Sequence, residues 1–223
     1  MRSYKEAPQS DRIKNTKMKK LLSDRWDIIK EMVKGKEVLD LGCVDHEAKQ
    51  EEGKDWLHRK IRQSAKSTLG VDYAAEEVSR LKNLGYEVIQ GNVETLNLGR
   101  KFDVIVAGNI IEHLSNPGLF LETVRKHLKE DGVFILTTDN CYGLRSLKAV
   151  TFSDGIRPNQ EHSMTFEEEV LKQLLRRHHF EIADFYYYNG PYPSAFKKWF
   201  IDILCKFRKS WAWQMLVVAR KPQ

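Results

Sequence analysis

Short apolar segments alternate with amphipathic segments along most of the chain. Two of the apolar segments, residues 102–107 (FDVIVA) and 132–138 (GVFILTT), are continuous, as in strands buried on both faces of a sheet. The amphipathic segments carry apolar residues at helical spacing. The pattern predicts seven strands, at residues 37–41, 68–71, 86–90, 102–107, 132–138, 180–187 and 213–220. It predicts helices at residues 47–64, 75–84, 117–130, 165–178 and 194–211.

Two of the predicted helices begin with recognisable signals. Pro117 stands in the first turn of its helix, where the missing amide hydrogen is not needed. Thr165 is followed three residues later by Glu168, which is a capping-box pattern. This pattern predicts that Thr165 is the N-cap of the helix over residues 165–178.

The alternation of strands and helices predicts the fold class. It indicates an α/β fold, with a doubly wound, seven-stranded and mostly parallel sheet covered by helices on both faces. Ligands of such sheets bind outside the carboxyl ends of the strands. We therefore expect the residues that follow four of the strands, Gly42, Asp72, Asn92 and Asn109, to form the binding site.

Three of these positions allow both a binding role and a purely structural one. Gly42 lets the backbone approach a ligand closely, but any turn from strand to helix can use a glycine. Asp72 can accept hydrogen bonds from both hydroxyls of a ribose, or can cap the helix over 75–84. Asn92 can bind an adenine edge, although Gly91-Asn92 is also a common turn pair.

The order and spacing of the strand-end motifs resemble those of a known family. The motifs are VLDLGC (38–43), GVD (70–72), GNVE (91–94), FDVIVAGNIIEHLSNP (102–117) and GVFILTTDN (132–140). This set resembles the class I S-adenosylmethionine-dependent methyltransferases, especially the small-molecule type 11/12 group, over residues 35–190 and the last strand. The resemblance implies S-adenosylmethionine as cofactor, a small-molecule acceptor and an antiparallel last strand.

The resemblance also implies a role for individual residues. Asp40, Gly42 and Cys43 would line the methionine moiety, Asp72 would bind the ribose, Tyr73, Asn92 and Val93 would surround the adenine, and Asn109 would lie near the methionine amine or the sulfonium. The first loop departs from the family's Gly-x-Gly-x-Gly pattern, because Val44 and His46 replace the later glycines. Loss of these glycines disfavours dinucleotide binding and leaves open a non-catalytic module that binds the cofactor without turnover.

Two histidines are candidate general bases for an acceptor hydroxyl. His113 follows the fourth predicted strand, and His162 precedes the helix at 165–178. Each can instead cap a helix or fix a loop, and Glu112 is a candidate supporting group. Cys43, Cys141 and Cys205 form no metal-like pair and no disulfide framework, so we expect no metal site and a reducing, cytoplasmic environment.

Length and charge add to this interpretation. The 223 residues suit one methyltransferase domain at 37–223, preceded by an N-terminal helical cover at 1–36. The net charge is +6, and both ends of the chain are basic. Basic ends can bind RNA, anionic lipid or an acidic substrate, or simply be solvated. An RNA methyltransferase is the disfavoured alternative, because Asn109-Ile110-Ile111-Glu112 stands where an Asn-Pro-Pro-aromatic motif would be expected.

The segment over residues 194–211 is amphipathic and basic. Aromatic and aliphatic side chains recur at helical spacing, and lysines occupy the other side. One interpretation is a helix on an anionic membrane surface that reaches a lipid-linked glycan acceptor; the other is a lid packed on its own fold. Residues 141–165 and 190–212 are expected to be substrate-side insertions. The sequence leaves the oligomeric state open.

Overall fold

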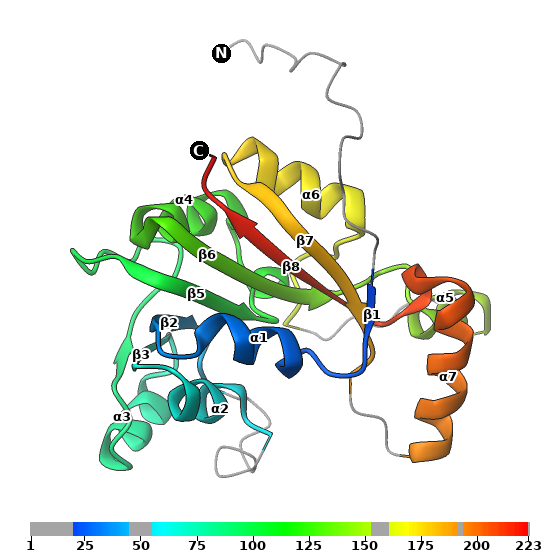
Figure 1. The fold of residues 1–223 in the computed structure, drawn as a ribbon, viewed down its shortest axis with the longest axis horizontal. Coiled ribbons are helices and arrows are strands. Elements are labelled where there is room, and N and C mark those ends of the chain that lie inside the picture. The colour runs from blue at the N-terminus through cyan, green and yellow to red at the C-terminus, as the bar shows by residue number, and fades with distance from the viewer. Residues whose placement is uncertain (1–19, 45–54, 153–160, 191–193, 223) are drawn as a thin grey trace.

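An eight-stranded sheet forms the centre of the fold (Figure 1). The structure is a computed structural model that describes residues 20–44, 55–152, 161–190 and 194–222. The strand order is β1-β7-β8-β6-β5-β2-β3-β4. The strands are β1 (Lys20–Leu22), β2 (Glu37–Leu41), β3 (Ser67–Asp72), β4 (Val88–Gln90), β5 (Phe102–Gly108), β6 (Leu128–Asp139), β7 (Glu181–Tyr188) and β8 (Gln214–Arg220).

All neighbouring strands are parallel except at β8. This last strand runs antiparallel to both β6 and β7, between which it lies. The sheet is therefore mostly parallel with an antiparallel last strand, as predicted. Strand order reverses between β2 and β5, and such a switch point opens a crevice at the carboxyl ends of the strands.

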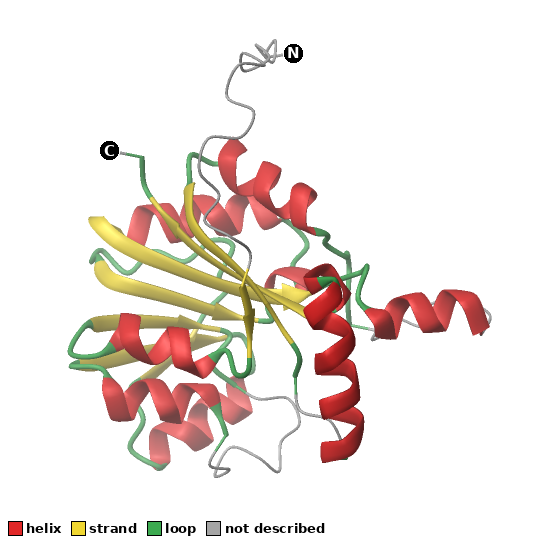
Figure 2. Ribbon diagram, turned by 45° about the vertical axis from the view of Figure 1, so that its right-hand side comes forward, coloured by secondary structure: helices red, strands yellow, loops and turns green. Residues whose placement is uncertain are grey.

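Helices cover both faces of the sheet (Figures 1 and 2). On one face, α1 (Trp26–Val33) and α2 (Leu57–Ser64) bury Ile29, Val33 and Ile61 against alternate residues of the strands. On the other face, α4 (Pro117–His127) and α6 (Glu168–Arg177) bury phenylalanine and leucine side chains in the main core. The remaining helices are α3 (Ala75–Asn83), η2 (Ile111–His113), α5 (Leu144–Phe152), α7 (Ala195–Phe207) and η3 (Lys209–Trp211).

The N-terminal region contains a strand that the sequence prediction missed. Residues 20–22 form β1, which pairs in parallel with β7 and places Leu21 beside Tyr187. The strand raises the total from the predicted seven to eight. The expected helical cover at 1–36 is represented by α1, and residues 1–19 lie outside the described part of the chain.

Two predicted helix boundaries are corrected by tertiary contacts. The N-cap of α6 is Glu167 rather than Thr165, and its carboxylate accepts hydrogen bonds from the backbone N–H groups of Glu169 and Val170. The buried Phe166 forms a bridge with Asn140, which keeps the chain extended up to the cap. Similarly, α4 ends before residue 130, because the chain enters β6 at residue 128.

Other segments match the predicted pattern in part. Of the helix expected at 47–64, the structure describes residues 55–64, in which α2 begins at Leu57, and 47–54 lie outside the described residues. The amphipathic segment at 194–211 forms α7 followed by η3. No described helix is long and apolar enough to span a membrane.

Candidate active site

A pocket of about 430 Å³ opens at the carboxyl ends of the parallel strands, beside the switch point. Its size lies within the usual range for small-molecule sites, roughly 300–1,000 Å³. The pocket is lined by Gly42, Val44, Asp72, Tyr73, Gly91, Asn92, Val93, Gly108, Asn109, Ile110, His113, Leu114 and Glu161. It therefore collects residues from the ends of β2, β3, β4 and β5, as expected for this sheet.

The pocket brings together most of the residues singled out in the sequence. Seven of them are lining residues, namely Gly42, Asp72, Tyr73, Asn92, Val93, Asn109 and His113. Asp40 and Cys43 are buried behind the wall and are not among the described lining residues. His162 is not a lining residue either, but its ring lies 4.6 Å, centroid to centroid, from that of His113.

The first loop of the pocket is held by Asp72. This buried carboxylate lies at the end of β3, where one oxygen accepts a hydrogen bond from the backbone N–H of Val44 (3.0 Å). The other accepts from the N–H of Ala74 (3.1 Å), at the start of α3. A carboxylate has about four acceptor sites, so two remain for ligand hydroxyls. Asp72 thus fixes the loop, contributes to the turn before α3 and still lines the pocket.

Gly42 lines the pocket with backbone atoms alone. Its φ of +75° lies in the left-handed region, which residues with a side chain rarely adopt. A Cβ at this position would lie 2.8 Å from Cδ1 of Ile110, on the neighbouring loop. The glycine therefore keeps open the space between the loops that follow β2 and β5.

A buried side-chain contact between Asp40 and His58 supports the first loop. Side chains of β2 point alternately to the two faces of the sheet, and that of Asp40 points toward α2. Its carboxylate lies 2.8 Å from Nδ1 of His58. Both side chains are almost fully buried. On the same side, the indole N–H of Trp56 donates to the carbonyl oxygen of Cys43 (2.9 Å). These contacts from the start of α2 hold a loop that lacks the family's later glycines.

The sequence analysis missed both His58 and Trp56. Their role depends on a contact between α2 and β2 that no local pattern reveals. The available signal was Asp40 itself, because a carboxylate inside an otherwise apolar strand needs a buried partner. Of the predicted loop, Val44 is described, whereas His46 lies outside the described residues.

The opposite wall of the pocket is built around Asn109, whose φ is +51°. Its amide oxygen accepts hydrogen bonds from Arg25 (3.0 Å) and from the hydroxyl of Thr137 (2.9 Å). Its amide nitrogen donates to Glu112 (3.2 Å) and more weakly to Asp139 (3.4 Å). Asn109 therefore links the N-terminal segment and β6 to η2, a role that the sequence did not reveal.

Asn92 also has a structural contact. Its side-chain oxygen accepts a hydrogen bond from the backbone N–H of Glu94 (2.8 Å), which is the predicted turn interaction. Glu94 in turn accepts from the N–H groups of Ser115 and Asn116, just before α4. The loop after β4 thereby fixes the loop after η2. An amide keeps further donors and acceptor capacity, so the turn does not prevent Asn92 from binding a ligand.

Glu112 is an unusually placed carboxyl group. Its side chain is 2% exposed and accepts hydrogen bonds from Thr138 (3.0 Å) and Asn109. Burial raises the pKa of Glu112 to about 7, and the neighbouring Asp139 carboxylate adds to the rise, while the hydrogen bonds oppose it. A carboxyl group with such a pKa beside a pocket is a typical functional group.

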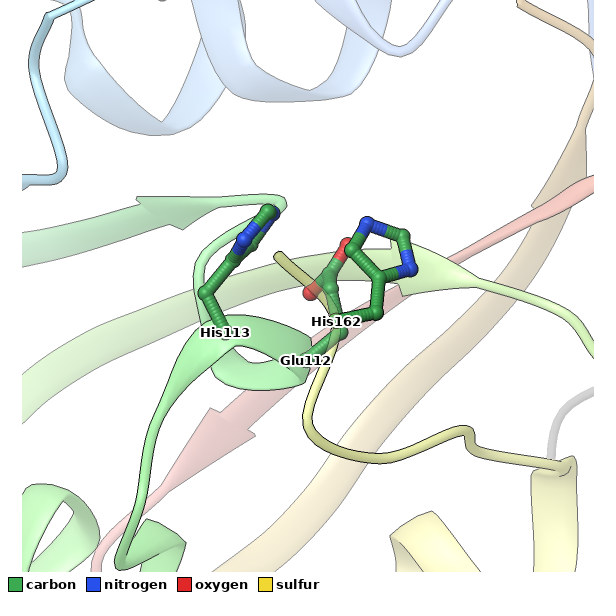
Figure 3. A group of neighbouring side chains, drawn as sticks. All are labelled: Glu112, His113 and His162. Carbon is green, nitrogen blue, oxygen red and sulfur yellow. The ribbon is translucent and has the colours of Figure 1, made fainter. Parts of the chain in front are cut away.

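The loop before α6 brings His162 next to η2. Ser163 anchors this loop, because its N–H donates to the carbonyl oxygen of Glu112 (2.9 Å) and its hydroxyl donates to that of Leu114 (2.6 Å). As a result, Glu112, His113 and His162 form one cluster at the pocket (Figure 3). The sequence identified both histidines but gave no indication that they would meet.

Comparison with known proteins agrees with this architecture. A family described as "Methyltransferase domain" matches residues 12–184, which is more than half of the chain. The chain belongs to this family. The match includes the strands that build the pocket and the loop that carries His162. The family predicted from the sequence motifs is thereby confirmed.

Curated relatives are similar over part of their length. A mitochondrial ubiquinone biosynthesis O-methyltransferase of Rattus norvegicus is 28% identical over 156 residues, which are 63% of this chain and 42% of the relative. A probable S-adenosylmethionine-dependent methyltransferase of Mycolicibacterium smegmatis is 28% identical over 155 residues, 67% of this chain and 54% of the relative. The chain thus spans about half the length of these relatives.

Solved structures share the fold. An S-adenosylmethionine-dependent methyltransferase from Mesorhizobium loti has a TM-score of 0.59 at 18% identity, covering 88% of this chain and 97% of the other. Magnesium protoporphyrin IX methyltransferase from Synechocystis, solved with bound SAH, has a TM-score of 0.56 at 15% identity, covering 88% and 79%. At these identities the similarity establishes the architecture.

Proposed function

We propose that the chain binds S-adenosylmethionine in the pocket and catalyses methyl transfer to an acceptor hydroxyl. The observation that carries the proposal is the convergence of Gly42, Asp72, Asn92 and Asn109 on one pocket in a methyltransferase domain. The left-handed Gly42 leaves a narrow cradle that a Cβ would fill, and the Asp72 carboxylate keeps acceptor sites. The residues present therefore fit an adenosyl cofactor.

Each residue has a proposed task in holding this cofactor. Asp72 accepts hydrogen bonds from the ribose hydroxyls, and Tyr73, which is 67% exposed at the pocket, lies against the adenine. Asn92 and the backbone of Val93 contact the adenine edge. The backbone of the loop from Gly42 lies along the methionine moiety. Because Asp40 and Cys43 are buried behind this loop, we assign them to its support.

The chemistry requires a hydroxyl oxygen to be aligned with the methyl group and to lose its proton. S-adenosylmethionine supplies the methyl group on a sulfonium, from which it is transferred by in-line displacement. The cluster of Glu112, His113 and His162 lies at the pocket, and we propose that it assists the loss of this proton. The two relatives described above support a methyltransferase, and one of them is named as an O-methyltransferase.

Calorimetric titration tests the binding step. We expect saturable binding of S-adenosylmethionine and S-adenosylhomocysteine and no binding of NADH. Asp72→Asn should weaken both sulfur ligands by roughly 10–100-fold, because charge-assisted hydrogen bonds are replaced by neutral ones. Asp131→Asn is the matched control, since this exposed residue lies near the opposite end of β6. Failure of the wild-type chain to bind either sulfur ligand would contradict the proposal, whereas binding without turnover would indicate a non-catalytic module.

We further propose that α7 brings the domain to an anionic membrane surface and thereby to a lipid-linked glycan acceptor. One side of α7 packs on the fold through the buried Cys205 and through a hydrogen bond from Asn189 to Asp202 (2.8 Å). The other side exposes Phe196 (72%) and Phe207 (83%), together with Trp199 and Phe200. Lys197, Lys206 and Arg208 are also exposed there. Exposed aromatic rings beside basic residues are typical of helices that lie on anionic lipid.

A further inference from the structure

The cluster of Glu112, His113 and His162 has the composition of a metal site. Each residue offers one ligand atom, and these atoms all lie within 4.8 Å of one another. Figure 3 shows the side chains of Glu112 and His113, from η2, beside that of His162, from the loop before α6. The rings are nearly perpendicular, at 86°. Metal–ligand bonds of about 2.1 Å require slightly closer spacing, which rotation of the half-buried histidines can provide.

The surroundings of the cluster are those of an organised site. The carboxylate of Glu112 is oriented by hydrogen bonds from Thr138 and Asn109, one to each oxygen. Such outer partners fix a ligand and leave its remaining lone pairs for the ion. Ser163 ties the His162 loop to the backbone of η2 through bonds to Glu112 and Leu114. The three ligands therefore come from two segments that are fastened together.

Electrostatics also favours a cation here. Glu112 is almost fully buried, and Asp139 is a second carboxylate nearby. A buried carboxylate is costly unless it is paired or coordinates a metal. Two imidazoles and one carboxylate suit first-row transition ions. Three protein ligands leave coordination positions open, as in catalytic sites.

We propose that Glu112, His113 and His162 bind a divalent first-row transition cation whose open positions face the pocket. His113 and Glu161 line the pocket, so the ion would lie at its wall. This inference departs from the expectation of no metal, which rested on the cysteines. The ligands are instead a Glu-His pair and a histidine distant in sequence.

The cation would act on the acceptor, and this part of the inference rests on the proposed function. A hydroxyl bound to a divalent cation loses its proton near neutral pH far more readily than a free one. The proton leaves to water, and the oxygen then forms a bond to the methyl carbon while the sulfur–methyl bond breaks. The products are the methyl ether and neutral S-adenosylhomocysteine. The histidines serve as ligands in this scheme rather than as bases.

Manganese binding tests the site without any substrate. The full chain is freed of metal with a chelator and titrated with Mn²⁺, and free Mn²⁺ is followed by electron paramagnetic resonance. We expect one saturable site per chain, with pulsed spectra that show coupling to two imidazole nitrogens. His162→Gln should weaken binding by at least about tenfold and remove one of the two couplings. His113→Gln should do the same.

His178→Gln is the matched control, because it removes an imidazole from the end of α6. It should leave Mn²⁺ binding and the nitrogen couplings unchanged. Circular dichroism melting shows whether each variant is folded, and Glu112→Gln removes the third proposed ligand. Zn²⁺ and Mg²⁺ compete in the same assay, and we expect Zn²⁺ to displace Mn²⁺ more effectively than Mg²⁺ does.

Several results would overturn the inference. These are absence of saturable Mn²⁺ binding, absence of nitrogen coupling, or equal affinity in wild type and both folded histidine variants. S-adenosylhomocysteine binding is measured on the same metal-free chain. Binding of S-adenosylhomocysteine without binding of Mn²⁺ would contradict only the proposed metal site. Binding of Mn²⁺ without binding of S-adenosylhomocysteine would contradict only the proposed function. Methyl transfer at full rate by the metal-free chain would return the histidines to the role of bases.

Discussion

Residues around the first loop are packed so closely that an added methyl group would clash with its neighbours. Gly70 lies in β3 opposite Asp40 of β2, under the loop that carries Cys43. A Cβ at Gly70 would lie 2.7 Å from the sulfur of Cys43 and 2.7 Å from Cε1 of His58. The absence of a side chain at residue 70 therefore lets the buried pair and the loop occupy the same small volume. The glycine of the motif GVD (70–72) therefore has a packing reason.

This packing predicts the effect of Gly70→Ala. We expect the free energy of unfolding in urea to fall by about 1–3 kcal/mol, the usual cost of overpacking a core. The double variant Gly70→Ala/Cys43→Ala should recover part of that loss, because the shorter side chain removes one of the clashes. Strict additivity of the two single variants would show that the glycine and the cysteine do not compete for space.

At the same scale, the sequence revealed positions better than contacts. Gly42, Asp72, Asn92 and Asn109 were found because each follows a strand, and parallel strands place such residues at one edge. The internal bonds of Asn109 to Arg25 and Glu112 were not found. They join residues that are distant in sequence or hidden in a turn, and no periodicity signals such contacts.

Among the elements, the buried strands were predicted best. The bounds of β2 agree with the prediction, and those of β3, β5, β7 and β8 agree within one residue at each end. A continuous apolar run that ends at a glycine or a polar residue indicates where a buried strand begins and ends. Boundaries set by distant contacts were predicted less well, as at the start of α6, where Phe166 pairs with Asn140.

Strand β1 is the element that the pattern could not reveal. Its three residues stand in a basic segment, and three residues are too few to show alternation. The strand forms because the edge of β7 offers unpaired backbone groups and because Leu21 packs on the main core. Tertiary structure, rather than local preference, therefore defines this element.

Replacement within β1 tests its contribution. Leu21→Asp should lower the free energy of unfolding by roughly 1–2 kcal/mol, which is part of the transfer free energy of a fully buried leucine, because Leu21 is half-buried. Lys20→Asp is the control, since it places an aspartate on the exposed neighbour in the same strand and changes the net charge by −2, against −1 for Leu21→Asp. An equal loss in both variants would attribute the effect to charge rather than to burial of Leu21.

In the whole molecule, the pocket and the helices α5 and α7 lie at one edge of the sheet. The pocket lies at the carboxyl ends of β2 to β5. Asp139, the end of β6, pairs with Gln214, the start of β8, so α5 and α7 are attached at that same edge. Figures 1 and 2 show both helices projecting from this end of the sheet. A membrane-bound acceptor approaching along α7 would therefore reach the side of the domain that carries the pocket.

Vesicle sedimentation tests this arrangement. The wild-type chain should sediment at low salt with vesicles of phosphatidylcholine and phosphatidylserine, and less at high salt because screening weakens the basic contacts. Replacement of Phe196, Trp199 and Phe200 by serine should abolish sedimentation. Val170→Ser, which removes an exposed apolar side chain from α6, should leave it unchanged. Absence of wild-type binding at low salt would contradict a membrane role for α7.

The position of β8 also has a consequence for the order in which the chain acquires its structure. Because β8 lies between β6 and β7, neither β7 nor β1 can join the rest of the sheet until residues 214–220 have been synthesised. The first strand to leave the ribosome must therefore wait for the last. Meanwhile the parallel half, from β4 to β6, can form early and expose the apolar edge of β6. A nascent chain of this domain is thus most vulnerable to aggregation just before its final strand is complete.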